Sequence, residues 1–160
     1  MNRSFVVLRL IRCSFVLGLV VAASLVADGN GTEIKLNAQL IWATNDPKPN
    51  DSKCHEVDAV LREKLGRIFK WKNYFEVKEE SFGVKPGEAK HVRMSKACEL
   101  ELRVVDDFTL EVKLFGEGKL TKTVRQSIQA LRQGELSVLA GDSKDRFGDA
   151  WFVVLSIPKK

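Results

Sequence analysis

The stretch CELELRVVDDFTLEVKLFGEGKLTKTVRQSI, residues 98–128, predicts three consecutive antiparallel strands. Apolar residues alternate with charged ones from Cys98 to Val104 and again from Leu110 to Leu114, and this period of two is typical of strands that bury one face. An Asp-Asp pair separates the first two runs and Gly-Glu-Gly separates the second from the third, as expected of turns. The centre of the chain is therefore expected to be a β-sheet.

The same alternation occurs in EIKLNAQLIW, residues 33–42, which is expected to be the first strand. The last run, AWFVVLSI, residues 150–157, is apolar at every position from Trp151 to Leu155. A run of this kind predicts an interior strand that is buried on both faces. Shorter strands are predicted near residues 73–78, 90–95 and 135–141.

One amphipathic helix is predicted over about residues 52–68, where apolar residues change to a helical spacing and Asp51 or Ser52 can cap the first turn. The apolar stripe of this helix consists of Val57, Val60, Leu61, Leu65 and Ile68. The fold class is thus α+β and mostly antiparallel β, with about seven strands and one helix packed on them. The sheet is expected to be either a sandwich or a strongly curved sheet closed by the helix.

The N-terminal segment has the layout of a secretory signal peptide, because three arginines precede an uncharged apolar run from Cys13 to Ala27. We expect residues 1–27 to be removed and residues 28–160 to form a single β-rich domain in the periplasm or outside the cell. An uncleaved segment, which would tether the domain to a membrane, is the alternative. After cleavage no membrane contact is expected.

Charge argues against a nucleic-acid partner. The chain has 26 Lys plus Arg and 21 Asp plus Glu, and residues 1–27 hold three Arg and no acid, which leaves 23 basic against 21 acidic residues. A nucleic-acid binder normally presents a clustered positive surface, whereas the basic and acidic residues here are interleaved.

Two cysteines remain in the expected mature chain, Cys54 and Cys98, and exported proteins commonly oxidise such pairs. We therefore expect a disulfide that ties the helix to the sheet. The alternative is a secreted thiol-dependent enzyme in which Cys54 acts with His55 or His91. Cysteine and histidine are also zinc ligands, but Cys54, His55, His91 and Cys98 lack the paired short spacings of zinc sites. No motif of a hydrolase, phosphate loop or dinucleotide site occurs, so no catalytic residue, metal or cofactor is predicted, and a binding role is favoured over an enzyme.

Two surfaces are candidates for binding. Trp71 and Tyr74 could form an aromatic groove for a sugar, a peptide or a protein, although such residues often fill the seam between a helix and a sheet. Lys90, Arg93 and Lys96 form the most basic local run and could bind an anion, although the run could also be the solvated face of a strand.

The polar loop near the C-terminus places Asp142, Asp145 and Asp149 close together in sequence. Carboxylates are calcium ligands, but this spacing is not that of an EF-hand, and a solvated hairpin loop is expected. Asn30 and Asn50 lie in glycosylation sequons, which would matter only in a host that glycosylates exported proteins.

The export signal, together with AQLIWATND, GELSVLAG and the final AWFVVLSI, resembles small uncharacterised exported bacterial proteins. The resemblance is to an order of elements and implies a compartment and a domain size, with no activity to transfer. We expect a soluble exported domain that acts as a binding or envelope-accessory module for an unknown protein or extracellular ligand.

Overall fold

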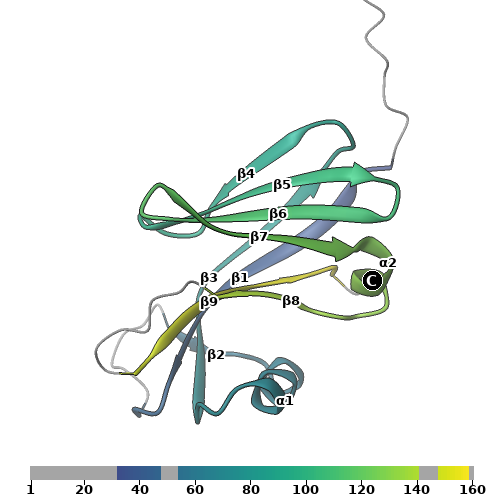
Figure 1. The fold of residues 1–160 in the computed structure, drawn as a ribbon. Helices are drawn as coiled ribbons and strands as arrows, with labels where there is room; N and C mark the ends of the chain where they lie inside the picture. The colour runs from purple at the N-terminus through teal and green to yellow at the C-terminus, as the bar shows by residue number, and fades with distance from the viewer. Residues whose placement is uncertain (1–31, 48–53, 141–147, 159–160) are drawn as a thin grey trace, which may run out of the picture.

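The computed structural model describes residues 32–47, 54–140 and 148–158, which form two antiparallel sheets stacked as a sandwich that is not closed (Figure 1). The four-stranded sheet has the order β4 (Ala89–Arg93), β5 (Cys98–Asp106), β6 (Thr109–Gly116) and β7 (Lys119–Ser127). The five-stranded sheet has the order β2 (His55–Glu56), β3 (Asn73–Val84), β1 (Ile34–Thr44), β9 (Ala150–Ser156) and β8 (Ser137–Ala140). The helices are α1 (Ala59–Ile68) and α2 (Ile128–Arg132). The predicted fold class is confirmed, and the sandwich is the observed arrangement.

The four-stranded sheet is a meander, as its alternating sequence predicts. Leu102 lies opposite Val112, and Val112 lies opposite Val124, so the apolar positions of three strands share one face. The turn between β6 and β7 consists of Glu117 and Gly118, whose φ angles of 51° and 77° are those of a tight hairpin turn that matches the strand twist. Glycine at the second position accepts this backbone conformation without steric cost.

In the five-stranded sheet β9 lies between β1 and β8, so the predicted interior position of the last strand is confirmed. Its residues 152–155 are all buried, but Trp151, the first residue of the predicted buried run, is 43% exposed, so the prediction was wrong at that position. The register of β1 against β3 shifts between Leu40 and Ile41, and such a bulge bends a strand and re-aims its side chains. The extra residue is Val77 of β3, while Leu40 and Ile41 of β1 face opposite layers of the core, as neighbours in a strand do.

The larger core layer lies between the two sheets. It includes Leu36 and Leu40 of β1, Leu102 of β5 and Val153 of β9. The smaller layer lies on the other face of the five-stranded sheet, under α1, and its buried members are Ile41, Ala43, Val57, Leu61, Leu65, Tyr74, Phe152 and Val154. The five-stranded sheet is therefore covered on one face by the other sheet and on part of its second face by a helix (Figure 1).

The helix begins at Ala59, later than the sequence indicated. Asp58 is its N-cap, and the Oδ1 atom of Asp58 accepts hydrogen bonds from the backbone N–H groups of Val60 and Leu61, both at 2.9 Å. Residues 55–56 form β2 instead of a helical turn, and Asp51 and Ser52 lie outside the described residues. The prediction of a helix from residue 52 was wrong because Val57 has the spacing of the helical stripe but belongs to the extended segment between β2 and α1.

Removal of this cap gives a first test of the fold. We expect Asp58→Ala to lower the free energy of unfolding by about 1 kcal/mol, because two backbone N–H groups of the first turn lose their acceptor. Asp107→Ala, in the exposed turn between β5 and β6, is the matched control and is expected to change stability by less than about 0.5 kcal/mol. Urea denaturation measures both variants, and equal losses would contradict the assigned helix start.

The short helix α2 was not predicted. It follows β7 directly, with Ser127 as its N-cap, and it buries Ile128 and Leu131 in the layer between the sheets. The chain passes through α2 from the four-stranded sheet to β8 of the five-stranded sheet, at one end of the sandwich (Figure 1). A helix of five residues is too short to produce a recognisable apolar period.

Candidate functional site

An apolar cavity of about 830 Å³ lies between the two sheets. It is found where the turns between β4 and β5 and between β6 and β7 face the five-stranded sheet, and Figure 1 shows the sheets diverging toward that end. Its apolar lining residues are Leu40, Val77, Met94, Ala97, Cys98, Leu114, Phe115, Leu139, Trp151, Phe152 and Val153. Small-molecule sites in proteins are commonly concave, mostly apolar and of about this volume.

Polar groups of this cavity include Lys78, Ser95, Glu117 and Thr121. Lys78 Nζ donates to the backbone carbonyl oxygen of Arg93 at 2.6 Å and lies 2.9 Å from Glu80 Oε1, so it connects β3 to the end of β4. Thr121 Oγ1 accepts from the backbone N–H of Gly116 at 3.2 Å. Most polar groups of the lining are thus occupied in local contacts, and the remaining surface is apolar.

Three aromatic residues lie side by side on the five-stranded sheet at the edge of the cavity: Trp151, which lines it, Trp42 and Phe75. Trp42 lies opposite Phe75 on one side and Trp151 on the other, and its ring is stacked on Trp151 with centroids 5.9 Å apart. Trp42 Nε1 donates to Asp149 Oδ2 at 2.9 Å, which satisfies part of the hydrogen bonding of a carboxylate that is only 7% exposed. Trp151 is 43% exposed and lines the cavity, so its indole forms part of the wall next to solvent.

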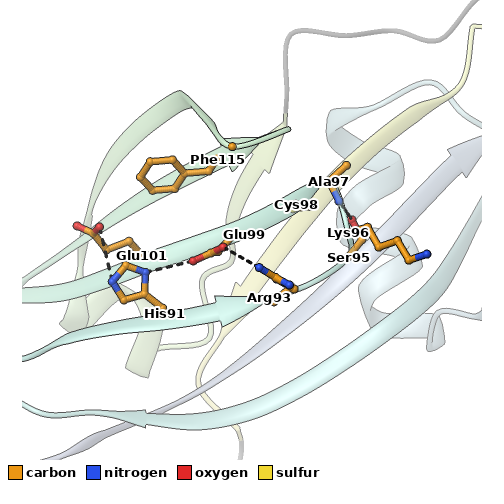
Figure 2. A pocket seen from close by; sticks show the side chains of 10 residues that line it. His91, Arg93, Ser95, Lys96, Ala97, Cys98, Glu99, Glu101 and Phe115 are labelled. Carbon is orange, nitrogen blue, oxygen red and sulfur yellow. Dashed lines mark hydrogen bonds and ion pairs between the residues drawn. The ribbon is translucent and has the colours of Figure 1, made fainter.

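A second, polar cleft of about 420 Å³ lies on the outer side of β4 and β5 (Figure 2). Figure 2 shows His91 between Glu101 and Glu99, and Arg93 beyond Glu99. His91 Nδ1 lies 3.3 Å from Glu99 Oε1, and Arg93 lies 3.9 Å from the same carboxylate. Glu101 accepts a hydrogen bond from Lys113 Nζ at 2.7 Å. This hydrogen bond lowers the pKa of Glu101 and keeps it ionised.

The disulfide expected between Cys54 and Cys98 is not present, and this prediction was wrong. The two cysteines are not at bonding distance. Cys54 precedes β2 at the edge of the five-stranded sheet, whereas Cys98 begins β5 in the other sheet. The prediction placed Cys54 in the first turn of a helix that in fact starts at Ala59. Burial raises the pKa of the Cys98 thiol, and a protonated thiol is a poor nucleophile.

The histidines considered for catalysis lie in different sheets. His55 is exposed on β2, directly after the buried Cys54, and His91 is exposed on β4. Within residues 32–47, 54–140 and 148–158, no group of three or more His, Cys, Asp or Glu side chains gathers where a metal ion could be held.

Of the two predicted binding surfaces, the aromatic one is largely buried and the basic one is only partly assembled. Tyr74 is fully buried under α1 and its hydroxyl donates to the carbonyl oxygen of Phe69 at 3.3 Å, while Trp71 is half-buried and packs on Phe69. These two rings therefore form the seam between helix and sheet. Arg93 and Lys96 both line the polar cleft, but Lys90 does not.

Lys90 and Arg93 are three positions apart in β4, so their side chains lie on opposite faces of the strand. Lys90 is two positions before Val92, which faces the core, whereas Arg93 is on the opposite face of β4. Of the three aspartates considered for calcium, only Asp149 is described, and it bonds Trp42. Asp142, Asp145, Asn30 and Asn50 lie outside the described residues, as do residues 1–27.

The cavity itself was not predicted from the sequence. Leu40, Cys98 and Leu114 have the alternation of core residues, and nothing in that pattern distinguishes a residue packed between sheets from one that lines a space between them. No helix in the described part of the chain is long and apolar enough to span a membrane. No family model, no curated protein and no solved structure matches this chain.

Proposed function

We propose that this protein is an exported binding module that takes up an apolar small molecule between its two sheets. The observation that carries the proposal is the cavity of about 830 Å³ with its largely apolar lining. Burial of apolar ligand surface there contributes about 25 cal/mol per Å² removed from water. The N-terminal pattern of residues 1–27 supports export, and the ligand is therefore proposed to be met outside the cytoplasm.

Two other roles were considered for this protein, a thiol-dependent enzyme and a membrane-tethered domain. A thiol-dependent enzyme that paired Cys54 with His91 would need the two side chains in contact, but Cys54 precedes β2 of the five-stranded sheet and His91 lies on β4 of the other sheet. A tethered domain with an uncleaved N-terminal segment would bind the same ligand, because the cavity lies wholly within the described residues.

The neutral fluorophore N-phenyl-1-naphthylamine tests the proposal, because its emission rises when it leaves water for an apolar site. We expect a saturable increase with one probe bound per chain. Val77 lines the cavity, and Val77→Trp, which fills part of the space with an indole, is expected to weaken probe binding at least about tenfold, equivalent to about 1.4 kcal/mol.

Val60→Trp is the matched control, because Val60 is 59% exposed on α1 and does not line the cavity. This variant is expected to bind the probe like the unmodified protein, and circular dichroism checks that both variants are folded. A probe that fails to saturate, or that binds equally well to both folded variants, would show that the cavity is not the binding site.

A further inference from the structure

The apolar cavity and the polar cleft are neighbours. Their linings share four residues, Ser95, Ala97, Cys98 and Phe115. These residues lie in the turn between β4 and β5, at the start of β5 and at the end of β6. A single ligand can therefore occupy the space between the sheets and extend around this turn to the outer side of β4 and β5.

The polar cleft is lined by two carboxylates, Glu99 and Glu101, and by the donor side chains Arg93 and Lys96. Its two carboxylates are already engaged, Glu101 by Lys113 and Glu99 by His91 and Arg93. Arg93 has five N–H donors, its side chain is 75% exposed, and among the described residues it makes one ion pair, with Glu99 at 3.9 Å. Lys96 makes no ion pair with any residue that the structure describes.

The two cations lie at the end of the cleft where it meets the cavity. Arg93 ends β4 and Lys96 is in the turn, three positions later and next to the shared residues Ser95 and Ala97. In Figure 2 Lys96 extends from the turn on the side of Arg93 that is away from Glu99. The Lys96 ammonium points away from Arg93 in this view, and the two exposed side chains flank the turn around which a group with acceptor oxygens would leave the cavity.

We propose that the ligand is a single-chain amphiphile with an anionic head group, whose chain occupies the apolar cavity and whose head group is bound by Arg93 and Lys96. This inference rests on the proposed function, because it assigns the polar end of the same ligand. Glu117, in the turn between β6 and β7, also lines the cavity and opposes an anion there. Its carboxylate reduces the affinity for the charged ligand and leaves a neutral one unaffected.

Displacement of N-phenyl-1-naphthylamine by decanoate and by decanol separates the head group from the chain, since the two ligands share a chain length. At neutral pH we expect decanoate to bind about tenfold more tightly than decanol, as hydrogen bonds to charged groups allow. Decyl phosphate is also expected to bind more tightly than decanol if the site recognises negative charge rather than the shape of a carboxylate. Acetate and inorganic phosphate, which have no chain, are expected not to displace the probe.

The double variant Arg93→Gln, Lys96→Gln is expected to remove the preference for decanoate without changing the affinity for decanol. Lys78 bonds the backbone oxygen of Arg93, so that contact remains in the variant. Glu117→Gln is the control of opposite sign and is expected to strengthen decanoate binding about two- to threefold while decanol is unaffected. Added salt is expected to weaken the preference for decanoate, because these charges are exposed.

The outcomes distinguish the two proposals. If neither decanol nor decanoate displaces the probe, or the probe does not bind, the proposed function fails. If both bind with equal affinity, or the double variant keeps the preference for decanoate, the cavity stands as a binding site and the anionic head group is wrong. If acetate or inorganic phosphate displaces the probe, the inference is also overturned, because the alkyl chain of the ligand would then have no role in binding.

Discussion

Replacement of Phe152 by alanine is expected to lower the free energy of unfolding by about 3–5 kcal/mol. Phe152 is 2% exposed and lies in the core layer under α1, where its ring is stacked on Phe69 with centroids 5.1 Å apart. Its removal would leave a void between the helix and the middle of the five-stranded sheet. A small domain has only about 5–15 kcal/mol of stability, so a large part would be lost.

Phe108→Ala is the matched control for this variant. Phe108 is 72% exposed in the turn between β5 and β6, and its truncation is expected to change stability by less than about 0.5 kcal/mol. Guanidinium denaturation followed by circular dichroism compares the two variants. Equal losses would mean that α1 is not packed on β9 as described.

Replacement of Leu102 by alanine is expected to cost about 2–5 kcal/mol. Leu102 is fully buried near the middle of β5, opposite Val112 of β6, and it faces the layer between the two sheets. Its side chain belongs to a different layer from Phe152, so the two substitutions test two independent packings of the sandwich.

Leu120→Ala provides the comparison, because Leu120 is 54% exposed on β7. Its loss is expected to stay below about 0.5 kcal/mol. If Leu102→Ala is no more destabilising than Leu120→Ala in urea denaturation, the two sheets do not pack face to face. The denaturant slope is expected to be unchanged in both variants, because neither alters the surface exposed on unfolding by much.

Much of the sheet structure follows from the sequence because strands that bury one face have a strict period of two. Leu100, Leu102 and Val104 alternate with charged residues, and the meander of β5, β6 and β7 is present as expected. The continuous apolar run of residues 151–155 likewise predicts the interior position of β9, and residues 152–155 are buried there, although Trp151 is partly exposed. These signals are local, and tertiary contacts reinforce them.

The helix boundary and β2 are less accessible to sequence reasoning. Val57 fits a helical stripe by spacing, yet it packs under α1 from the segment before the helix. Asp58 is the N-cap of α1, but the side-chain oxygens of Asp51 and Ser52 could accept the same capping hydrogen bonds, so the sequence is compatible with several helix starts. The two residues of β2 are paired to Glu76 and Phe75 of β3, and no pattern of two residues can be periodic.

The candidate site depends on where the sheets separate, and this is a property of the whole fold. Val77, which lines the cavity, is the extra residue of the bulge in β3, between the pairs Leu40–Lys78 and Ile41–Glu76, and its position follows from the pairing of β3 with β1. The cysteine pairing failed for the same reason, because a disulfide requires a distance that sequence separation does not supply. Local charge in the sequence identified Arg93 and Lys96 as candidates. The cavity beside them could not be predicted in this way, because it forms only when the two sheets pack together.

The central claim, that an apolar ligand enters the space between the sheets, is tested most directly by methyl NMR of methionine. The chain has two methionines, Met1 and Met94, and Met94 is 1% exposed and lines the cavity. With ¹³C-methyl-labelled methionine, addition of decanol is expected to shift the Met94 signal progressively to a plateau. The same titration of Val77→Trp is expected to leave that signal nearly unchanged. A Met94 signal that does not move while decanol saturates the unmodified protein would contradict the claim.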